Sequence, residues 1–333
     1  MRSSRCALLS VGDLGDIGTA VAEGIAAATG GVQVLGADRE WDLRGYDLAI
    51  AFGPMQPLRP LIARLAVMKN VPPVVVWFTE QVPHPQFPTL ATRIAARARY
   101  SAECANGLFP AGRAGRFRAL GEMMALQQLG VLRLICAFTE TNAGFLRRLG
   151  LPAARVPMGF HPLFGENLGL ARDVDVVFLG STRDKRRRKF VGGLEEKLVS
   201  RGISVVVRDG SAARPAIFGQ ERTNLLNRAK VMLNLMRQPW DDPVFRILLA
   251  APNGAMVLSE EVSEGSMGPF RSGEHFAVAA PQALPDAIEF YVNREAERTQ
   301  IARSAYEFVT TKLTMTKMTA ELLRISGFCD GQS

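Results

Sequence analysis

The stretch Asp175-Val-Val-Phe-Leu-Gly-Ser181 decides the fold of this chain. It reads as a buried strand that ends in a glycine turn, and the basic segment Arg183-Asp-Lys-Arg-Arg-Arg-Lys189 follows as the start of a helix. In α/β proteins such a unit holds phosphate groups, because free backbone N–H groups and the positive end of the helix point at the anion. Cationic side chains beside the turn add to this attraction. We therefore expect an anion site here, with a solvated helix face as the alternative for most of the basic side chains.

Short apolar runs alternate with helical segments on both sides of this stretch. Strands are expected at 6–11, 32–35, 46–52, 74–78 and 132–138, and again at 174–179, 203–208, 231–236, 255–258 and 276–279. Helices are expected at 19–29, at 58–68, from the cap at 139–142 to Gly150, at 185–200, at 244–251 and in three segments between 284 and 325. This alternation predicts an α/β fold with two doubly wound, Rossmann-like domains, each with a parallel sheet covered on both faces.

The Pro- and Gly-rich segment 156–170 is the best boundary between the domains. We expect an N-terminal domain over 1–158, a second domain over 159–310 and a C-terminal helical tail over 311–333. A length of 333 residues suits two hydrophobic cores better than one.

Composition indicates an ordinary globular protein, with 47% apolar and 22% charged residues. No apolar run approaches the roughly 20 residues that span a bilayer. The short apolar run after Arg5 is interrupted at Gly12, and nothing resembles a signal cleavage site. A cytoplasmic location is expected.

The cysteines and histidines are too scattered to predict a metal site or a disulfide framework. The chain has 4 cysteines and 3 histidines, and no CxxC pair. The net charge of +8 suits an anionic ligand or an anionic lipid surface. Nucleic acid is not expected as a partner, because aromatic residues do not alternate with the basic ones.

A glycine-bearing turn near the N-terminus has two interpretations. Gly12, Gly15 and Gly18 head a βαβ unit, and Asp38 follows about twenty residues later, as in a dinucleotide-binding fingerprint. The tight GxG pair is absent, however, and Asp13 would place a carboxylate where a pyrophosphate should lie. The alternative is the first turn of any doubly wound domain, which can also admit an acceptor.

Two further segments of the first half carry candidate functional residues. Glu80 and His84 follow the strand 74–78 at its carboxyl end, where ligands of parallel sheets bind, so both are candidates for acid–base chemistry. The alternative is a proline-rich loop with two solvated polar groups. The arginine-rich segment Arg93–Arg118 is either a solvated face or a patch for anionic lipid at the inner face of the membrane or for an acidic acceptor.

The order of pieces in the second half resembles the group-1 glycosyltransferases of the GT-B fold, especially their spore-maturation-type (CgeB-like) branch. That branch shows a "DVxFxGS" strand and turn, an Arg shortly after, a "KxxLN" strand, an "RxFExxAxG" helix and an "FxxGxE" turn. The matching residues here are Asp175–Ser181, Arg186, Lys230–Asn234, Arg246–Gly254 and Phe270–Glu274. Upstream, Val156-Pro-Met-Gly-Phe-His-Pro162 is similar to the hinge of the same branch.

The resemblance implies two domains that face each other across a cleft, with C-terminal helices that cross back to the N-terminal domain. It implies transfer of a sugar from a nucleoside diphosphate donor, a UDP- or GDP-sugar, to an unidentified glycan, lipid-linked or small-molecule acceptor. No metal and no further cofactor are expected. The donor-binding residues would be Gly180, Ser181, Lys185, Arg186, Asn234, Arg246, Gly254 and Glu274. In an inverting enzyme the base would be Glu80, His84 or Asp13; the sequence leaves open whether the sugar configuration is retained or inverted.

One position departs from the family pattern. Counted from Arg246 and Gly254, the Glu of the family helix falls on Leu249, which can make only apolar contacts. A non-catalytic GT-B protein that binds nucleotide is therefore the first alternative. An NAD-dependent oxidoreductase that uses the turn between Gly12 and Gly18 is the second.

Overall fold

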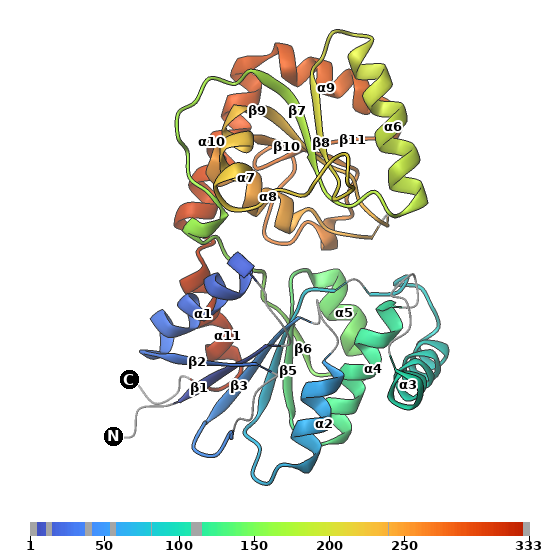
Figure 1. The fold of residues 1–333 in the computed structure, drawn as a ribbon, viewed down its shortest axis with the longest axis vertical. Coiled ribbons are helices and arrows are strands. Elements are labelled where there is room, and N and C mark those ends of the chain that lie inside the picture. Colours follow the sequence, from blue (N-terminus) through green and yellow to red (C-terminus); the bar gives the residue numbers. More distant parts are fainter. Residues whose placement is uncertain are drawn as a thin grey trace. The chain divides into compact units, whose positions relative to one another are not determined.

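The computed structural model describes residues 5–10, 15–36, 42–53, 58–80, 82–107, 115–238 and 240–328. The chain divides into two compact units, of which the first comprises Met1–Pro157 with Met315–Ser333 and the second Met158–Thr314. Each unit contains one parallel sheet with its helices (Figure 1). The prediction of an α/β fold with two Rossmann-like parallel-sheet domains is confirmed.

The sheet of the first unit has the strand order β2-β1-β3-β4-β5-β6, and every pair of neighbours is parallel. Its strands are β1 (Cys6–Ser10), β2 (Val32–Gly36), β3 (Leu48–Gly53), β4 (Val74–Phe78), β5 (Leu132–Ala137) and β6 (Ala153–Arg155). Every residue of β1, β3 and β4 is buried, as expected for strands covered on both faces.

The helices of the first unit include two that the sequence pattern did not reveal. Its helices are α1 (Gly15–Thr29), α2 (Arg59–Val67), α3 (Thr89–Asn106), α4 (Gly115–Gln128), α5 (Glu140–Arg148) and α11 (Met315–Ile325). The segment 93–118 was expected only as an arginine-rich face, but it contains most of α3 and the start of α4. These two helices approach closely at Gly121, where a Cβ atom would lie 2.5 Å from the carbonyl oxygen of Ala96.

The last helix of the chain packs within the first unit. In Figure 1, α11 lies beside α1, and the Thr319 hydroxyl donates a hydrogen bond to the Gly24 carbonyl oxygen over 2.9 Å. Gly24 permits this approach, because a Cβ atom there would lie 2.6 Å from Cγ of Met315. The C-terminal tail therefore completes the N-terminal unit.

The sheet of the second unit has the strand order β11-β10-β9-β7-β8, again parallel throughout. Its strands are β7 (Val174–Leu179), β8 (Val205–Arg208), β9 (Ala229–Asn234), β10 (Met256–Glu260) and β11 (Ala277–Ala279). Its helices are α6 (Lys185–Val199), α7 (Gly219–Arg228), α8 (Val244–Ala250), α9 (Leu284–Asn293) and α10 (Glu295–Thr311), with short 3-10 turns at 162–164, 251–253, 264–266 and 281–283.

The strand order locates the point at which a ligand is expected. From β7 the chain moves outward to β8, and from β9 it moves in the other direction to β10 and β11. In open parallel sheets, ligands bind outside the carboxyl ends of the strands at the point where this direction reverses. In the second unit that point lies between the carboxyl ends of β7 and β9, beside the predicted turn at Gly180.

Candidate functional site

The turn after β7 is held open by the conformation of Gly180. Its φ of +154° is one that side-chain-bearing residues rarely adopt, and a Cβ atom there would lie 2.7 Å from Nη2 of Arg246. The N–H group of Gly180, predicted to face the diphosphate, instead donates to the carbonyl oxygen of Arg208 over 3.0 Å. The expectation for this N–H group was wrong, because it extends the β7–β8 pairing by one residue.

The start of α6 already has an anionic cap. Asp184 is the N-cap residue, and its carboxylate accepts a hydrogen bond from the N–H group of Arg187 over 3.2 Å. A carboxylate in this place competes with a phosphate for the positive end of the helix. Ser181 and Lys185 are exposed beside this cap. An anion at this turn therefore needs cationic side chains in addition to the helix end.

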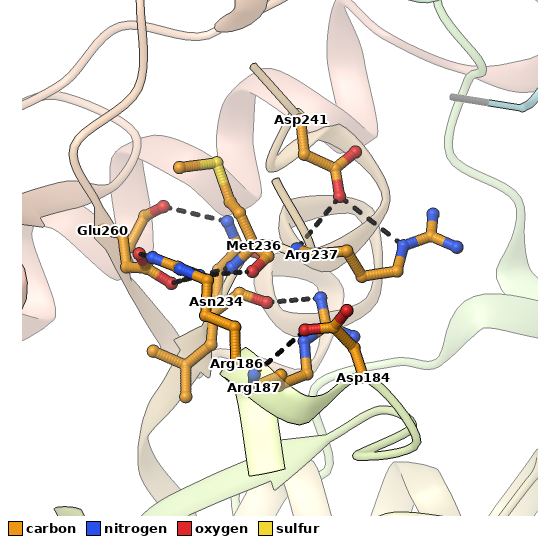
Figure 2. A network of polar contacts seen from close by, with 10 residues as sticks. Asp184, Arg186, Arg187, Asn234, Met236, Arg237, Asp241 and Glu260 are labelled. Carbon is orange, nitrogen blue, oxygen red and sulfur yellow. Dashed lines mark hydrogen bonds and ion pairs between the residues drawn. The ribbon is translucent and has the colours of Figure 1, made fainter. Parts of the chain in front are cut away.

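Arg186, the arginine chosen from the sequence, forms an ion pair with Glu260, the last residue of β10 (Figure 2). It also donates a hydrogen bond to the carbonyl oxygen of Met236 over 2.8 Å. The Glu260 side chain is 3% exposed and accepts a second hydrogen bond from the N–H group of Met236. The hydrogen bond to Glu260 raises the pKa of Arg186. Arg186 thus links α6 to the carboxyl ends of β9 and β10.

The neighbouring Arg187 points into the protein. Its side chain donates to the carbonyl oxygens of Ser181, over 3.2 Å, and of Leu235. It therefore bridges the ends of β7 and β9. Burial, together with the charges of Arg246 and Arg237, lowers the pKa of Arg187 to about 10, so the guanidinium stays charged at neutral pH.

Arg187 was not among the predicted site residues, although its spacing in the sequence indicates that it is buried. Arg187 lies in register with the apolar positions Val191, Leu194 and Leu198, which form the buried face of α6. A charged residue in such a series is predicted to point inward, and a buried charge requires partners.

Arg246 is the cation at the turn that has the fewest partners. It lies on α8, and among the described residues it makes no ion pair and its Nε has no hydrogen-bond partner. Asp241 and Asp242 contribute negative charge nearby, while burial is the main cause that lowers the pKa of Arg246. Burial and the Asp241 carboxylate raise the pKa of Asp242 to about 7, so Asp242 is only partly ionised at neutral pH.

Lys230 and Asn234, from the motif at 230–234, connect strands to one another. Lys230 at the start of β9 pairs with Asp175 on β7 over 2.7 Å. Asn234 at the end of β9 is 3% exposed and donates to the hydroxyl oxygen of Ser259 over 2.8 Å. These contacts fix the register of β7, β9 and β10 and thereby the position of the turn.

Two predicted donor-binding residues lie elsewhere. Gly254 precedes β10, roughly 20 Å along the strand from Glu260 at a rise of about 3.3 Å per residue. It adopts a φ of +71° next to the Arg172 side chain. Glu274 precedes β11 and pairs with Arg271 over 3.2 Å. Both residues thus precede a strand, whereas Gly180 and Glu260 lie at the carboxyl ends of theirs.

The candidate acid–base residues belong to the first unit. Glu80 and His84 follow β4 at its carboxyl end, and Nδ1 of His84 accepts a hydrogen bond from the N–H group of Gln86 over 3.2 Å. Asp13 lies outside the described residues. Among the residues that the structure describes, no three His, Cys, Asp or Glu side chains gather as a metal site.

A cavity of about 720 Å³ adjoins the turn on the side of β8. Thr182, Arg188, Asp209 and Arg214 are among its lining residues, and the Thr182 hydroxyl donates to Asp209 over 2.7 Å. A volume of this size is within the range of small-molecule sites. The cavity runs along α6, and Gly180 and Arg246 are not among its lining residues.

Comparisons with known proteins agree with this geometry. Residues 176–324, from β7 to α11, match a family model described as "Glycosyl transferase-like". The structure of HepE from Anabaena in complex with UDP and glucose matches with a TM-score of 0.59 at 12% identity, over 97% of this chain and 99% of that one. No curated protein matches the chain in sequence.

Two further solved structures share the fold. Sucrose-phosphate synthase from Thermosynechococcus elongatus matches with a TM-score of 0.60 at 13% identity, over 97% of this chain and 98% of that one. An α-glucosyltransferase in complex with UDP and a 13-mer DNA matches with a TM-score of 0.60 at 11% identity, over 97% of this chain and 99% of that one. The family match and the GT-B fold support a glycosyltransferase.

The glycosyltransferase-like match contains the whole arginine cluster at the end of β7. Arg186, Arg187 and Arg246 all lie between residues 176 and 324. Leu249, the position that departs from the family helix, is 6% exposed and follows Arg246 by one turn of α8. The distinctive features of this site are therefore an apolar Leu249 and an Arg246 without an ion-pair partner among the described residues.

Proposed function

We propose that the protein transfers a sugar from a nucleoside diphosphate donor to an acceptor hydroxyl. The favoured donor is a UDP-sugar. Support for UDP comes from HepE and the α-glucosyltransferase, which have the same fold and were solved with UDP. We also assign the chain to the spore-maturation-type branch, on the series of motifs from Asp175 to Glu274.

The observation that carries the proposal is Arg246. When the glycosidic bond to the diphosphate breaks, its electron pair and negative charge remain on the diphosphate oxygen. A preorganised cation at that oxygen lowers the barrier, because it stabilises charge that develops in the transition state. Arg246 is fixed beside Gly180 and has no carboxylate in ion-pair contact among the described residues. Arg186, by contrast, is neutralised by Glu260.

The acceptor hydroxyl must lose its proton as the new glycosidic bond forms. Glu80 and His84, at the carboxyl end of β4, remain the candidates for this base, together with Asp13. With Arg246 at the leaving group, the proposed reaction does not require a metal ion. Transfer is therefore expected to continue in the presence of EDTA.

Thermal shift with nucleotides tests the donor site. A ligand that binds only the folded state raises Tm, so UDP is expected to raise it in the wild-type protein. Arg246→Gln should abolish the shift. Arg228→Gln is the matched control, because Arg228 lies in the same unit and pairs with Asp173 at the surface. Equal UDP shifts in the wild-type protein and in Arg246→Gln would remove Arg246 from the donor site.

The buried Leu249 favours a second candidate function, a GT-B protein that binds nucleotide without transferring a sugar. Both candidates predict the UDP shift, but only the transferase releases UDP from UDP-sugar in the presence of an acceptor mixture. The family match favours either of them over the NAD-dependent oxidoreductase. A Tm shift with NAD⁺ and none with UDP or GDP would reverse that order.

A further inference from the structure

The amino-terminal half of α3 exposes an apolar stripe. Leu90 and Ile94 are 71% and 60% exposed, and their spacing of four residues places them on one side of the helix. Thr92, Ala96 and Glu103 form the buried side. Two large aliphatic side chains in adjacent turns, both exposed, are more than the single apolar residues that are normal on a surface.

Positive charge borders this stripe, and no exposed acidic residue accompanies it among the described residues 82–107. Arg93 and Arg97 are exposed on the same side, and neither forms an ion pair with a described residue. Glu103 is the one acidic residue between positions 82 and 107. It is 1% exposed and accepts a hydrogen bond from Arg99 over 2.8 Å. The exposed side of α3 is thus apolar and cationic.

This surface differs from the patch expected at Arg93–Arg118. Arg99 is turned toward Glu103, and Arg118 lies near the buried Glu122. Arg113 lies outside the described residues. The cations available to a partner on α3 are therefore Arg93 and Arg97, and the aliphatic residues beside them were not part of the expectation.

We propose that this side of α3, formed by Leu90, Arg93, Ile94 and Arg97, docks the first unit on an anionic lipid surface. A helix that combines aliphatic residues with arginines lies in the plane of a membrane, with the apolar residues among the headgroups and the guanidinium groups on lipid phosphates. Arginine suits this place because its apolar stem packs beside the inserted residues while its head remains in water.

The composition of the stripe favours lipid over a protein partner. Protein interfaces are centred on aromatic anchors, and α3 presents none on this side. The neighbouring Phe87 is engaged with Phe117, at a ring distance of 6.1 Å. No helix among the described residues has the length and apolar character needed to cross a membrane. Two aliphatic and two basic residues therefore give weak, reversible, salt-sensitive attachment.

Vesicle sedimentation with the full chain tests this proposal. The wild-type protein is expected to sediment with vesicles of phosphatidylcholine and phosphatidylglycerol but not with phosphatidylcholine alone. Binding should be lost in about 1 M NaCl, where the Debye length is about 3 Å. The double variants L90Q/I94Q and R93Q/R97Q should each weaken binding at least about tenfold, since each basic residue near the surface contributes several-fold.

The matched control is V67Q/K69Q on and beside α2. Val67 is 82% exposed in the same unit, and Lys69 is an exposed cation next to it. This variant should bind within about twofold of the wild-type protein. Circular dichroism melting of all variants checks that they fold. If the folded wild-type protein does not bind anionic vesicles, the proposal is overturned and α3 is left as a protein-docking face. Equal binding by the two α3 variants and the control variant overturns it as well.

Discussion

Replacing Glu122 by glutamine should remove a pH dependence from the stability of the first unit. Glu122 lies in the middle of α4 with an exposed fraction of 0%, and neither carboxylate oxygen has a hydrogen-bond partner among the described residues. Burial raises its pKa to about 8, and the nearby Arg118 side chain and the backbone N–H groups of Leu58 and Arg59 offset only part of this effect. The carboxyl group is therefore mostly protonated at neutral pH in the folded protein and ionised in the unfolded chain.

The sign follows from the two pKa values. Between the ordinary value of 4.5 and the folded value of about 8, the folded state binds more protons than the unfolded state. The free energy of unfolding therefore falls as the pH rises through this window, by at most about 1.4 kcal/mol per pH unit. Between pH 5.5 and 7.5 the loss is roughly 2–3 kcal/mol. Glutamine does not titrate, so Glu122→Gln should lack this loss and be more stable than the wild-type protein at pH 7.5.

Urea unfolding followed by tryptophan fluorescence measures the effect. In a Trp240→Phe background the remaining tryptophans, Trp41 and Trp77, both belong to the first unit. Glu23→Gln, an exposed position on α1, is the control and should keep the wild-type pH dependence. The reasoning fails if the first unit is equally stable at pH 5.5 and 7.5, or if Glu122→Gln is the less stable protein at pH 7.5.

Three further substitutions test the contacts described above. Gly180→Ala should displace the Arg246 guanidinium and weaken UDP binding about tenfold or more in calorimetric titrations. It should also lower the free energy of unfolding by about 1 kcal/mol. Unchanged affinity for UDP would contradict the assignment of the turn. Glu260→Gln should lower the free energy of unfolding by about 2–4 kcal/mol, because Arg186 and the Met236 N–H group lose a buried anion. Urea unfolding measures this change. A change within experimental error would show that the pair does not stabilise the protein. Gly24→Ala should destabilise the packing of α11 by about 1–3 kcal/mol, because the added Cβ atom overlaps Met315. The expected result is faster proteolysis of the C-terminus. A wild-type rate of proteolysis would refute the close contact.

The strands and the turn at Gly180 could be predicted because their sequence signals are local. Buried strands appear as short apolar runs, and a glycine marks the end of β7. α4 could not be found in this way. Every residue from Ala119 to Leu126 is buried, because α3, α2 and β5 surround the helix, so the apolar pattern has no period of 3.6 residues. α3 was not predicted because its arginines interrupt the apolar pattern that indicates a helix.

The sequence indicates cations beside the carboxyl end of β7, but it does not show which partner each cation has. A run of basic residues at 185–189 shows that cations gather at the turn, but the choice among them depends on which carboxylate each one meets. Glu260 comes from β10, 74 positions beyond Arg186, and nothing local in the sequence joins the two. The same limit applies to Gly254 and Glu274, which precede β10 and β11 and do not lie at the carboxyl ends of these strands.

The contact between α11 and α1 also sets the order in which the protein can finish folding during synthesis. Met315 is made 158 residues after Pro157, since 315 minus 157 is 158. At about 5–20 residues per second, the ribosome needs roughly 8–30 seconds for that interval. The second unit is complete once Thr314 has emerged, whereas the first still lacks the helix that covers Gly24. The half of the protein that is translated first is thus the last to be finished, and until then α1 lacks the helix that packs on it.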